Sequence, residues 1–194
     1  RCVKRCPSFP AYFADNSTRT CVAVCPGYTY GAPVTRVCES PRNCSAGYFA
    51  ENLTKLCVSQ CPATQAAYAE NNTQRCLRRC PLGTFADNST YTCVSICPES
   101  PSYFGYAQLC LEACPIKTYA DTPTRLCVAS LNCSNSTWGD PTSQTCVSTC
   151  PFNYFADKRT DFKLCVQLCP ITYYADDYTK SCVDKCPLAN KTYG

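Results

Sequence analysis

The cysteines are the residues of this sequence whose types and spacing could do chemistry. All 22 fall in one repeated frame, in which a first cysteine precedes a second by four residues, or by six in two places. Zinc sites commonly use C-x2-C spacing with histidine, and redox catalysis uses C-x-x-C. Here the usual spacing is C-x3-C and histidine is absent. We therefore expect disulfides, no metal and no cofactor, in a secreted or outer cell-surface location.

Two disulfide pairings fit this frame. In the favoured pairing each second cysteine bonds to the next first cysteine, because that separation is always 13 or 15 residues. The predicted pairs are Cys6–Cys21, Cys25–Cys38, Cys44–Cys57, Cys61–Cys76, Cys80–Cys93, Cys97–Cys110, Cys114–Cys127, Cys133–Cys146, Cys150–Cys165 and Cys169–Cys182. Cys2 and Cys186 then remain for partners outside this sequence. The rival pairing joins first to first and second to second cysteines, which groups the repeats in twos.

Asparagines in N-x-S/T motifs are a second set of candidate sites, for N-linked glycans. They are Asn16, Asn43, Asn52, Asn71, Asn88, Asn132, Asn135 and Asn190. A purely structural interpretation is that Asn, Ser and Thr are turn residues here. The compartment and the number of motifs favour glycosylation, although the two N-C-S motifs, at Asn43 and Asn132, are weaker acceptors. O-linked glycans are possible on so Thr-rich a surface.

An acid followed three residues later by threonine recurs along the chain. The pairs are Asp15–Thr18, Glu51–Thr54, Glu70–Thr73, Asp87–Thr90, Asp121–Thr124, Asp157–Thr160 and Asp176–Thr179. Each offers too few carboxylates for a calcium loop, whereas aspartate at the start of a turn can bond to the backbone. We expect hairpin turns there. With no histidine and no recurring carboxylate pair, we expect no enzyme.

An aromatic residue followed by Ala or Gly occurs once in every repeat, between the cysteines. We expect these rings to pack over the disulfides, while the small residue leaves room for the adjacent repeat. The predicted packing residues are Phe13, Tyr30, Phe49, Tyr68, Phe85, Phe104, Tyr119, Trp138, Phe155, Tyr174 and Tyr193. Phe104 lies two residues nearer the next cysteine than most, and Phe155 two residues farther. An even change keeps the same face of a strand inward.

The elements that must position these residues are short. First cysteines recur in steps of 17 or 19 residues, which defines eleven tandem repeats. Each repeat reads as a strand at the aromatic residue, a turn, and a strand entering the next cysteine. Each repeat is too short to bury a core of its own, and the composition cannot supply a large common core. Stability must therefore come from crosslinks and from contacts between neighbouring repeats. The expected fold is small and disulfide-rich, mostly irregular with short β-hairpins, forming an elongated rod or solenoid.

A slower period of five repeats lies on top of this pattern. Blocks span residues 2–92 and 93–181, and a third starts at 182. Asn-Cys-Ser occurs once in each full block, at Asn43 and Asn132. We interpret residues 1–194 as one continuous array without a separate globular domain, cut from a longer protein. The net charge of +4 is scattered, which argues against nucleic-acid binding, and no apolar run is long enough to span a membrane.

The motif C-x3-C-P…[YF]-A-[DE]-x-x-T-x-x-C-V is similar to furin-like, growth-factor-receptor-type cysteine-rich repeats. It most resembles the long tandem arrays in surface proteins of ciliates and other protists. The resemblance covers the whole chain and implies a secreted or surface-anchored rod of small disulfide-linked hairpins without catalytic residues. Ser45 and Ser134 depart from it in the proline position, and Gly105-Tyr106 departs where Ala-Asp is usual.

Two functions remain after these exclusions. The first is a structural component of a glycosylated extracellular filament or cell-surface coat, whose partners are further repeats of the same chain or identical chains. The second is the stalk or ectodomain of a surface receptor or adhesin that binds a protein or glycan. A binding site normally interrupts a repeat with a long loop. The regular five-repeat period therefore favours the filament.

Overall fold

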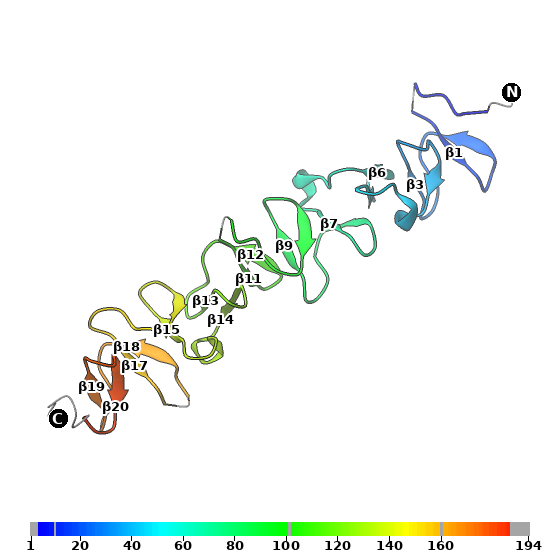
Figure 1. Ribbon diagram of the computed structural model, residues 1–194. Helices are drawn as coiled ribbons and strands as arrows, with labels where there is room; N and C mark the ends of the chain where they lie inside the picture. Colours follow the sequence, from blue (N-terminus) through cyan, green and yellow to red (C-terminus); the bar gives the residue numbers. More distant parts are fainter. Residues whose placement is uncertain (1–3, 10, 101, 160, 187–194) are drawn as a thin grey trace. The chain divides into compact units, whose positions relative to one another are not determined.

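The fold is a disulfide-rich array of short β-hairpins with almost no helix, as the sequence predicts. The computed structural model describes residues 4–9, 11–100, 102–159 and 161–186. The chain divides into two compact units, Arg1–Ser95 and Ile96–Gly194. In each unit the hairpins follow one another in chain order, as Figure 1 shows.

The N-terminal unit holds five hairpins and two single-turn 3-10 helices. Its strands are β1 (Phe13–Asp15), β2 (Thr20–Val22), β3 (Tyr30–Gly31), β4 (Cys38–Glu39), β5 (Phe49–Glu51), β6 (Leu56–Val58), β7 (Tyr68–Glu70), β8 (Arg75–Leu77), β9 (Phe85–Asp87) and β10 (Thr92–Val94). The 3-10 helices are η1 (Pro41–Asn43) and η2 (Ala63–Gln65).

The C-terminal unit holds five hairpins and one 3-10 helix, η3 (Ser130–Asn132). Its strands are β11 (Phe104–Tyr106), β12 (Leu109–Leu111), β13 (Tyr119–Asp121), β14 (Leu126–Val128), β15 (Trp138–Asp140), β16 (Thr145–Val147), β17 (Phe155–Asp157), β18 (Leu164–Val166), β19 (Tyr174–Asp176) and β20 (Ser181–Val183). Both η1 and η3 precede the N-C-S cysteine of their repeat, where the spacing between cysteines is wider.

The register within the hairpins is constant. The small residue lies opposite the cysteine of the second strand, and the aromatic residue lies opposite the residue after that cysteine. This residue is aliphatic, as in the Phe13↔Val22 pair, except for Glu39 opposite Tyr30. Phe104↔Leu111 and Phe155↔Val166 keep this register although their turns are two residues shorter and longer. Even changes in turn length therefore preserve the inward face, as expected.

Ten disulfides staple the ten hairpins, and they join the ten pairs of the favoured scheme. Their separations are 13 or 15 residues, as for Cys44–Cys57 and Cys61–Cys76. A bridge across a loop of this length contributes about 3 kcal/mol by restricting the unfolded chain. Cys186 is unpaired in the structure, and Cys2 lies outside the described residues.

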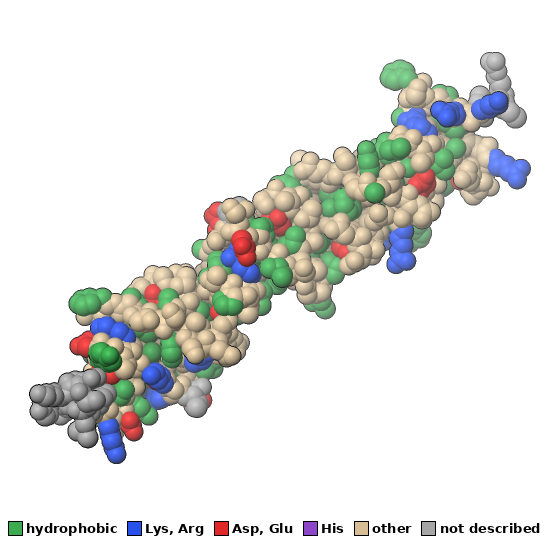
Figure 2. All heavy atoms as spheres, in the orientation of Figure 1, with side chains coloured by type: hydrophobic (Ala, Val, Ile, Leu, Met, Phe, Trp, Pro, Cys, Tyr) green, Lys and Arg blue, Asp and Glu red, His purple; other side chains and the backbone are tan. Residues whose placement is uncertain are grey.

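The core is small and is built at the junctions between hairpins, because three-residue strands leave little else to bury. Each junction contains a ring, a small residue and a disulfide. On the face drawn in Figure 2, apolar side chains are spread among the other side chains and the backbone, and Lys and Arg side chains are dispersed. The described residues contain no helix with the length and hydropathy of a membrane span.

The ring of one hairpin packs against the disulfide of the following hairpin. Phe13 contacts Cys25 and Cys38, and Tyr30 lies with Cys44, Ala50 and Cys57. The small residue leaves room for this ring, as predicted: a Cβ placed on Gly31 would approach the Phe13 ring to 2.6 Å. Buried rings, at most 9% exposed, are Phe13, Tyr30, Tyr68, Phe104, Tyr119 and Phe155, whereas Phe49, Phe85 and Trp138 are half-buried.

Two of the predicted packing residues differ from these nine. Tyr174 is 45% exposed, because no described hairpin follows it to cover its ring. The repeat that would cover this ring lies outside the described residues, so its packing stays a prediction. Tyr193 lies outside them.

Backbone hydrogen bonds tie the hairpins of each unit together. The N–H of the small residue donates to a carbonyl of the next hairpin. That carbonyl belongs to the residue two positions before the cysteine of the second strand. The Ala14–Arg36 bond measures 2.9 Å, the Gly31–Lys55 bond 2.8 Å, and six further junctions repeat it. Strands of successive hairpins also pair in parallel, as β3 does with β6. The hairpins of a unit thus form a ladder.

In all ten hairpins, the residue two positions before the cysteine of the second strand has a positive φ, for example 62° at Arg36. Glycine is the usual residue in this conformation, because a left-handed φ costs other residues roughly 1–2 kcal/mol. Here the residues are Arg19, Arg36, Lys55, Gln74, Tyr91, Gln108, Arg125, Gln144, Lys163 and Lys180. We call them the clasp residues, for the contacts that their side chains make.

Clasp side chains reach back over the ring of the preceding hairpin. The Arg36 guanidinium lies 5.0 Å from the Phe13 ring centroid and donates to the Pro7 carbonyl at 2.9 Å. Lys55 lies 5.0 Å from the Tyr30 ring and donates to the Gly27 carbonyl at 2.6 Å. Cation–π contacts of this kind contribute about 0.5–2 kcal/mol. At Arg36, Lys55, Arg125 and Lys180, such contacts help to offset the cost of the left-handed backbone.

Candidate functional site: the acid-anchored turns and their sequons

A buried acid begins eight of the hairpin turns. It directly follows the small residue and is at most 5% exposed in every case. The eight are Asp15, Glu51, Glu70, Asp87, Asp121, Asp140, Asp157 and Asp176. An ionised carboxylate is costly to bury unless it is hydrogen-bonded, so each turn must supply donors.

The donors come from the turn itself. Glu51 accepts the N–H of Leu53 at 2.8 Å, and the N–H and hydroxyl of Thr54 at 2.7 and 2.6 Å. Asp87 accepts the N–H of Ser89 at 2.9 Å and the Thr90 hydroxyl at 2.6 Å. The predicted role of the acid in the turn is therefore confirmed. Asp140 belongs to the same set, with Ser143 in place of threonine.

These bonds keep the acids ionised at neutral pH. Burial raises the pKa of Asp87, but hydrogen bonds from Thr90 and Ser89 outweigh it and leave the pKa below its ordinary value. The same balance lowers the pKa of Glu51, Glu70, Asp121, Asp140 and Asp157. At Asp15 and Asp176 the largest cause is a hydroxyl donor, Ser17 or Thr179, and the pKa is again lowered.

Asp121 and Asp157 each accept from a kind of side-chain donor that the turns described above do not use. Asp121 accepts the Thr124 hydroxyl at 2.6 Å and also the hydroxyl of Ser134, in the following repeat, at 2.6 Å. Ser134 therefore connects two repeats from the position where most repeats have proline. Asp157 pairs with Arg159, whose Nη2 lies 2.8 Å from Oδ2. Thr160, the predicted partner of Asp157, lies outside the described residues.

Four sequon asparagines directly follow a buried acid and are exposed: Asn16, Asn52, Asn71 and Asn88. The threonine of each sequon donates its hydroxyl to that acid, for example Thr18 to Asp15 at 2.7 Å and Thr73 to Glu70 at 2.5 Å. One threonine therefore serves both the turn and the acceptor motif. The asparagine side chain lies outside the turn network, where an added sugar would displace nothing buried.

Tyrosines from the preceding repeat orient two of these asparagines. Tyr30 donates its hydroxyl to Asn52 Oδ1 at 2.5 Å, and Tyr68 donates to Asn88 Oδ1 at 2.6 Å. The bonds engage the amide oxygen and do not use the nitrogen, which is the atom that carries an N-linked sugar. Neither tyrosine role was visible in the sequence, because the partners lie 22 and 20 residues apart.

The other sequons lie away from the acid turns. Asn43, Asn132 and Asn135 are exposed, and Asn190 lies outside the described residues. In the two N-C-S motifs the middle residues, Cys44 and Cys133, are buried in disulfides. An acceptor at these two positions would have to be modified before its disulfide forms.

The clasp residues form contacts that were not predicted from the sequence. The sequence does show a pattern that could have indicated them, since Arg, Lys, Gln or Tyr occupies this position in all ten described hairpins. The described residues contain no group of three or more His, Cys, Asp or Glu arranged to hold a metal ion. The carboxylates near the turns are occupied by the turns themselves, which favours a structural interpretation of the acids.

Fold and site together define a disulfide-stapled tandem-repeat protein whose turns present sequon asparagines to solvent. A disulfide-rich repeat pattern of this kind fits an extracellular structural or surface protein. In comparisons with known proteins, no family model, no curated protein and no solved structure matches the chain.

Proposed function

We propose that the chain is a structural segment of a glycosylated extracellular filament or cell-surface coat. The observation that carries this proposal is the recurring junction, in which a ring of one hairpin is held by the small residue, disulfide and clasp residue of the next. Arrays of this type grow by adding repeats, because each repeat contacts only its neighbours. Disulfides at every hairpin suit a material that must persist outside the cell.

On this proposal the partners are further repeats of the same chain or identical chains. The chain has no catalytic role, binds no nucleic acid and needs no cofactor beyond its covalent glycans. The likeness to furin-like repeats stays part of the proposal, and the buried acids and clasp residues refine it. The acids stabilise the turn of each hairpin and the clasp residues join neighbouring hairpins, as the repeats of a rod require.

Imaging of the native material tests the proposal. An antibody against residues 1–194 should decorate continuous fibrils or a coat at regular intervals in electron micrographs. The complete gene should continue with further five-repeat blocks. A short array that ends in a globular ligand-binding head would instead support a receptor or adhesin stalk and overturn the filament.

The glycan part of the proposal has its own test. Expression in a secretory eukaryotic host, followed by intact-mass measurement before and after enzymatic deglycosylation, should reveal glycans on Asn16, Asn52, Asn71 and Asn88. Asn71→Gln should remove one glycan mass. Asn72→Gln is the matched control, because Asn72 is also exposed but heads no sequon. An unchanged mass after deglycosylation of the wild-type chain would refute the glycan coat.

A further inference from the structure

A tyrosine hydroxyl holds the amide oxygen of two sequon asparagines in the N-terminal unit. Tyr30 donates to Asn52 Oδ1 at 2.5 Å. Tyr68 donates to Asn88 Oδ1 at 2.6 Å. In both cases the tyrosine occupies the ring position of the preceding repeat, and the asparagine directly follows the buried acid of its turn. The same contact therefore occurs twice, in equivalent places.

Asn71 is a natural comparison for these two asparagines. It occupies the same place in its own turn, but the ring position of the preceding repeat holds Phe49, which carries no hydroxyl. Phe49 packs against the Cys61–Cys76 disulfide of the following hairpin, as Tyr30 packs against Cys44–Cys57. The two rings have equivalent places, so the chemical difference between them is one hydroxyl group.

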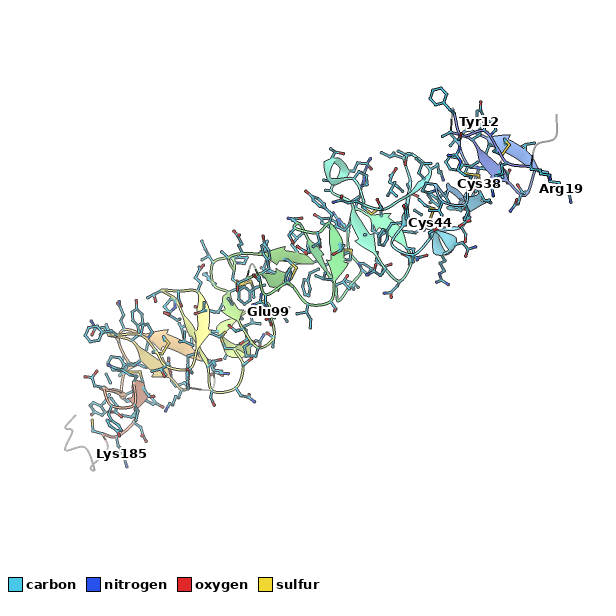
Figure 3. The ribbon with its side chains drawn as sticks, turned by 45° about the horizontal axis from the view of Figure 1, so that its top comes forward. Tyr12, Arg19, Cys38, Cys44, Glu99 and Lys185 are labelled. Atoms are coloured by element: carbon cyan, nitrogen blue, oxygen red, sulfur yellow. A yellow bond between two sulfur atoms is a disulfide. The ribbon has the colours of Figure 1, made fainter. Side chains whose placement is uncertain are left out.

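Packing fixes both tyrosines independently of any sugar. Tyr30 is buried on the disulfide of the following hairpin, whose Cys44 is labelled in Figure 3. Arg75 Nη2 lies 3.5 Å from the Tyr30 hydroxyl oxygen. Tyr68 is also buried and stacks on the clasp residue Tyr91, with ring centroids 6.2 Å apart. A donor that packing already holds in place loses little conformational entropy when it bonds.

The turn fixes the backbone beside each asparagine as well. Glu51 accepts the N–H of Leu53 at 2.8 Å, directly after Asn52. Asp87 accepts the N–H of Ser89 at 2.9 Å, directly after the other asparagine. The remaining freedom of the asparagine is rotation about its two side-chain torsions. A hydrogen bond to Oδ1, at the end of the side chain, restricts both torsions at once.

We propose that each tyrosine holds the N-linked glycan of its asparagine in a fixed orientation, at Asn52 and at Asn88. A glycan on Asn71 rotates about its side chain instead. An N-linked sugar occupies Nδ2 and leaves Oδ1 as an acceptor, so the tyrosine bond is kept after glycosylation. The proposal rests on the glycosylated coat and adds which of its glycans have a fixed direction. Such glycans suit regular contacts between neighbouring chains of a coat.

Nuclear magnetic resonance of the asparagine side chains tests the proposal. The chain is expressed with ¹⁵N-labelled asparagine in a secretory host that makes high-mannose glycans. An endoglycosidase then trims each glycan to a single N-acetylglucosamine. The order parameter of the Nδ2–H bond should exceed about 0.6 at Asn52 and Asn88 and lie below about 0.6 at Asn71, because values below this mark flexible groups.

Two reciprocal variants test the hydroxyl itself. Tyr30→Phe keeps the ring and should shift the Asn52 side chain away from its bonded orientation by about three- to tenfold. Its order parameter should then fall below about 0.6, while that of Asn88 in the same molecule stays unchanged. Phe49→Tyr is the matched reverse change and should raise the order parameter of Asn71 above about 0.6. Unchanged backbone amide shifts in the other repeats show that both variants fold.

Equal order parameters at Asn52, Asn71 and Asn88 of the glycosylated chain would overturn the proposal and leave the coat function standing. A folded Tyr30→Phe variant that keeps the order parameter of Asn52 would do the same. If Tyr30→Phe does not fold, the result for Phe49→Tyr decides, and an unchanged Asn71 then overturns the proposal. A wild-type chain whose mass does not change on deglycosylation would instead refute the glycan coat and the proposal together.

Discussion

Replacing Asp121 with asparagine should destabilise the C-terminal unit while changing almost no volume. Asp121 is 0% exposed, and its Oδ2 accepts two hydroxyls, from Thr124 and Ser134, each at 2.6 Å. Its Oδ1 accepts the Ser134 N–H at 3.1 Å. Asparagine keeps Oδ1 as an acceptor, but it has an NH₂ group in place of Oδ2 and carries no charge.

The magnitude follows from those two hydroxyl bonds. A hydrogen bond to a charged group contributes about 1.5–3 kcal/mol, and a neutral one about 0.5–1.5 kcal/mol. If both hydroxyls rotate to accept from the new amide, each bond still loses about 1 kcal/mol. We therefore expect Asp121→Asn to lower the free energy of unfolding by about 2 kcal/mol at neutral pH.

The chain has one tryptophan, and it reports on this region. Trp138 belongs to the same repeat as Ser134 and packs against the next disulfide, Cys150–Cys165. Denaturant unfolding followed by Trp138 fluorescence, with disulfides intact, measures the change. Glu112→Gln is the control for charge removal, because Glu112 is exposed. Glu51→Gln is the control for distance, because it alters a buried turn acid in the other unit.

The pH dependence separates this explanation from a packing defect. The pKa of Asp121 is lowered in the folded chain: burial raises it, but bonds from Ser134 and Thr124 lower it more. A depressed folded pKa gives stability that is present above the unfolded value and lost as the pH falls through the folded value. The difference between wild type and Asp121→Asn should therefore shrink below about pH 4. A difference below about 0.5 kcal/mol at pH 7, or one that persists at low pH, would refute this reasoning.

Three further predictions concern the crosslinks and the junctions. Non-reducing peptide mapping should recover the ten disulfides from Cys6–Cys21 to Cys169–Cys182, and finding Cys2–Cys21 together with Cys6–Cys25 would reject this pairing. Arg125→Gln removes a guanidinium 4.7 Å from the Phe104 ring and its bond to the Pro98 carbonyl. This substitution should lower the stability of the junction by about 1–2 kcal/mol. The measurement is hydrogen exchange of the Gly105 N–H, which bonds to the Arg125 carbonyl and should exchange faster. As a control, Lys117→Gln, at an exposed residue with a positive φ, should leave that exchange unchanged. Gly139→Ala places a Cβ 2.9 Å from the Tyr119 ring, and this overpacking should lower the free energy of unfolding by about 1 kcal/mol. Denaturant unfolding followed by Trp138 fluorescence measures the change, and an unchanged stability would mean that the ring moves aside freely.

The parts of the fold that depend on short sequence distances could be predicted. The disulfide separation is constant, so the spacing of Cys25 and Cys38 alone favoured their pairing. Strands formed at the aromatic residues and turns formed at the acids, because each involves neighbours in the sequence. The turn at Asp140 was missed only because serine replaces threonine there.

Contacts between repeats could not be read in the same way. The sequence suggested that rings cover disulfides, but Phe13 covers that of the following repeat, Cys25–Cys38. Turn chemistry would place glycine or asparagine in the left-handed position, whereas the chain has arginine or lysine at several of these positions. That choice makes sense only when the ring beneath the side chain is known. A spacing rule cannot supply that information, because it describes one repeat at a time.

The turns also bear on why the sequon asparagines occur where they do. In the C-terminal unit, Asp121, Asp140 and Asp176 form the same hydroxyl-bonded turns with Thr122, Pro141 and Asp177 in the following position. The turn therefore does not need asparagine there. Yet in the N-terminal unit asparagine follows all four turn acids, with threonine at the acceptor position each time. At Asn52 and Asn88 the bond from a tyrosine of the preceding repeat is one structural reason for asparagine. The proposed glycosylation is a reason that would apply to all four positions, and it would place the glycans of the N-terminal unit on its acid turns.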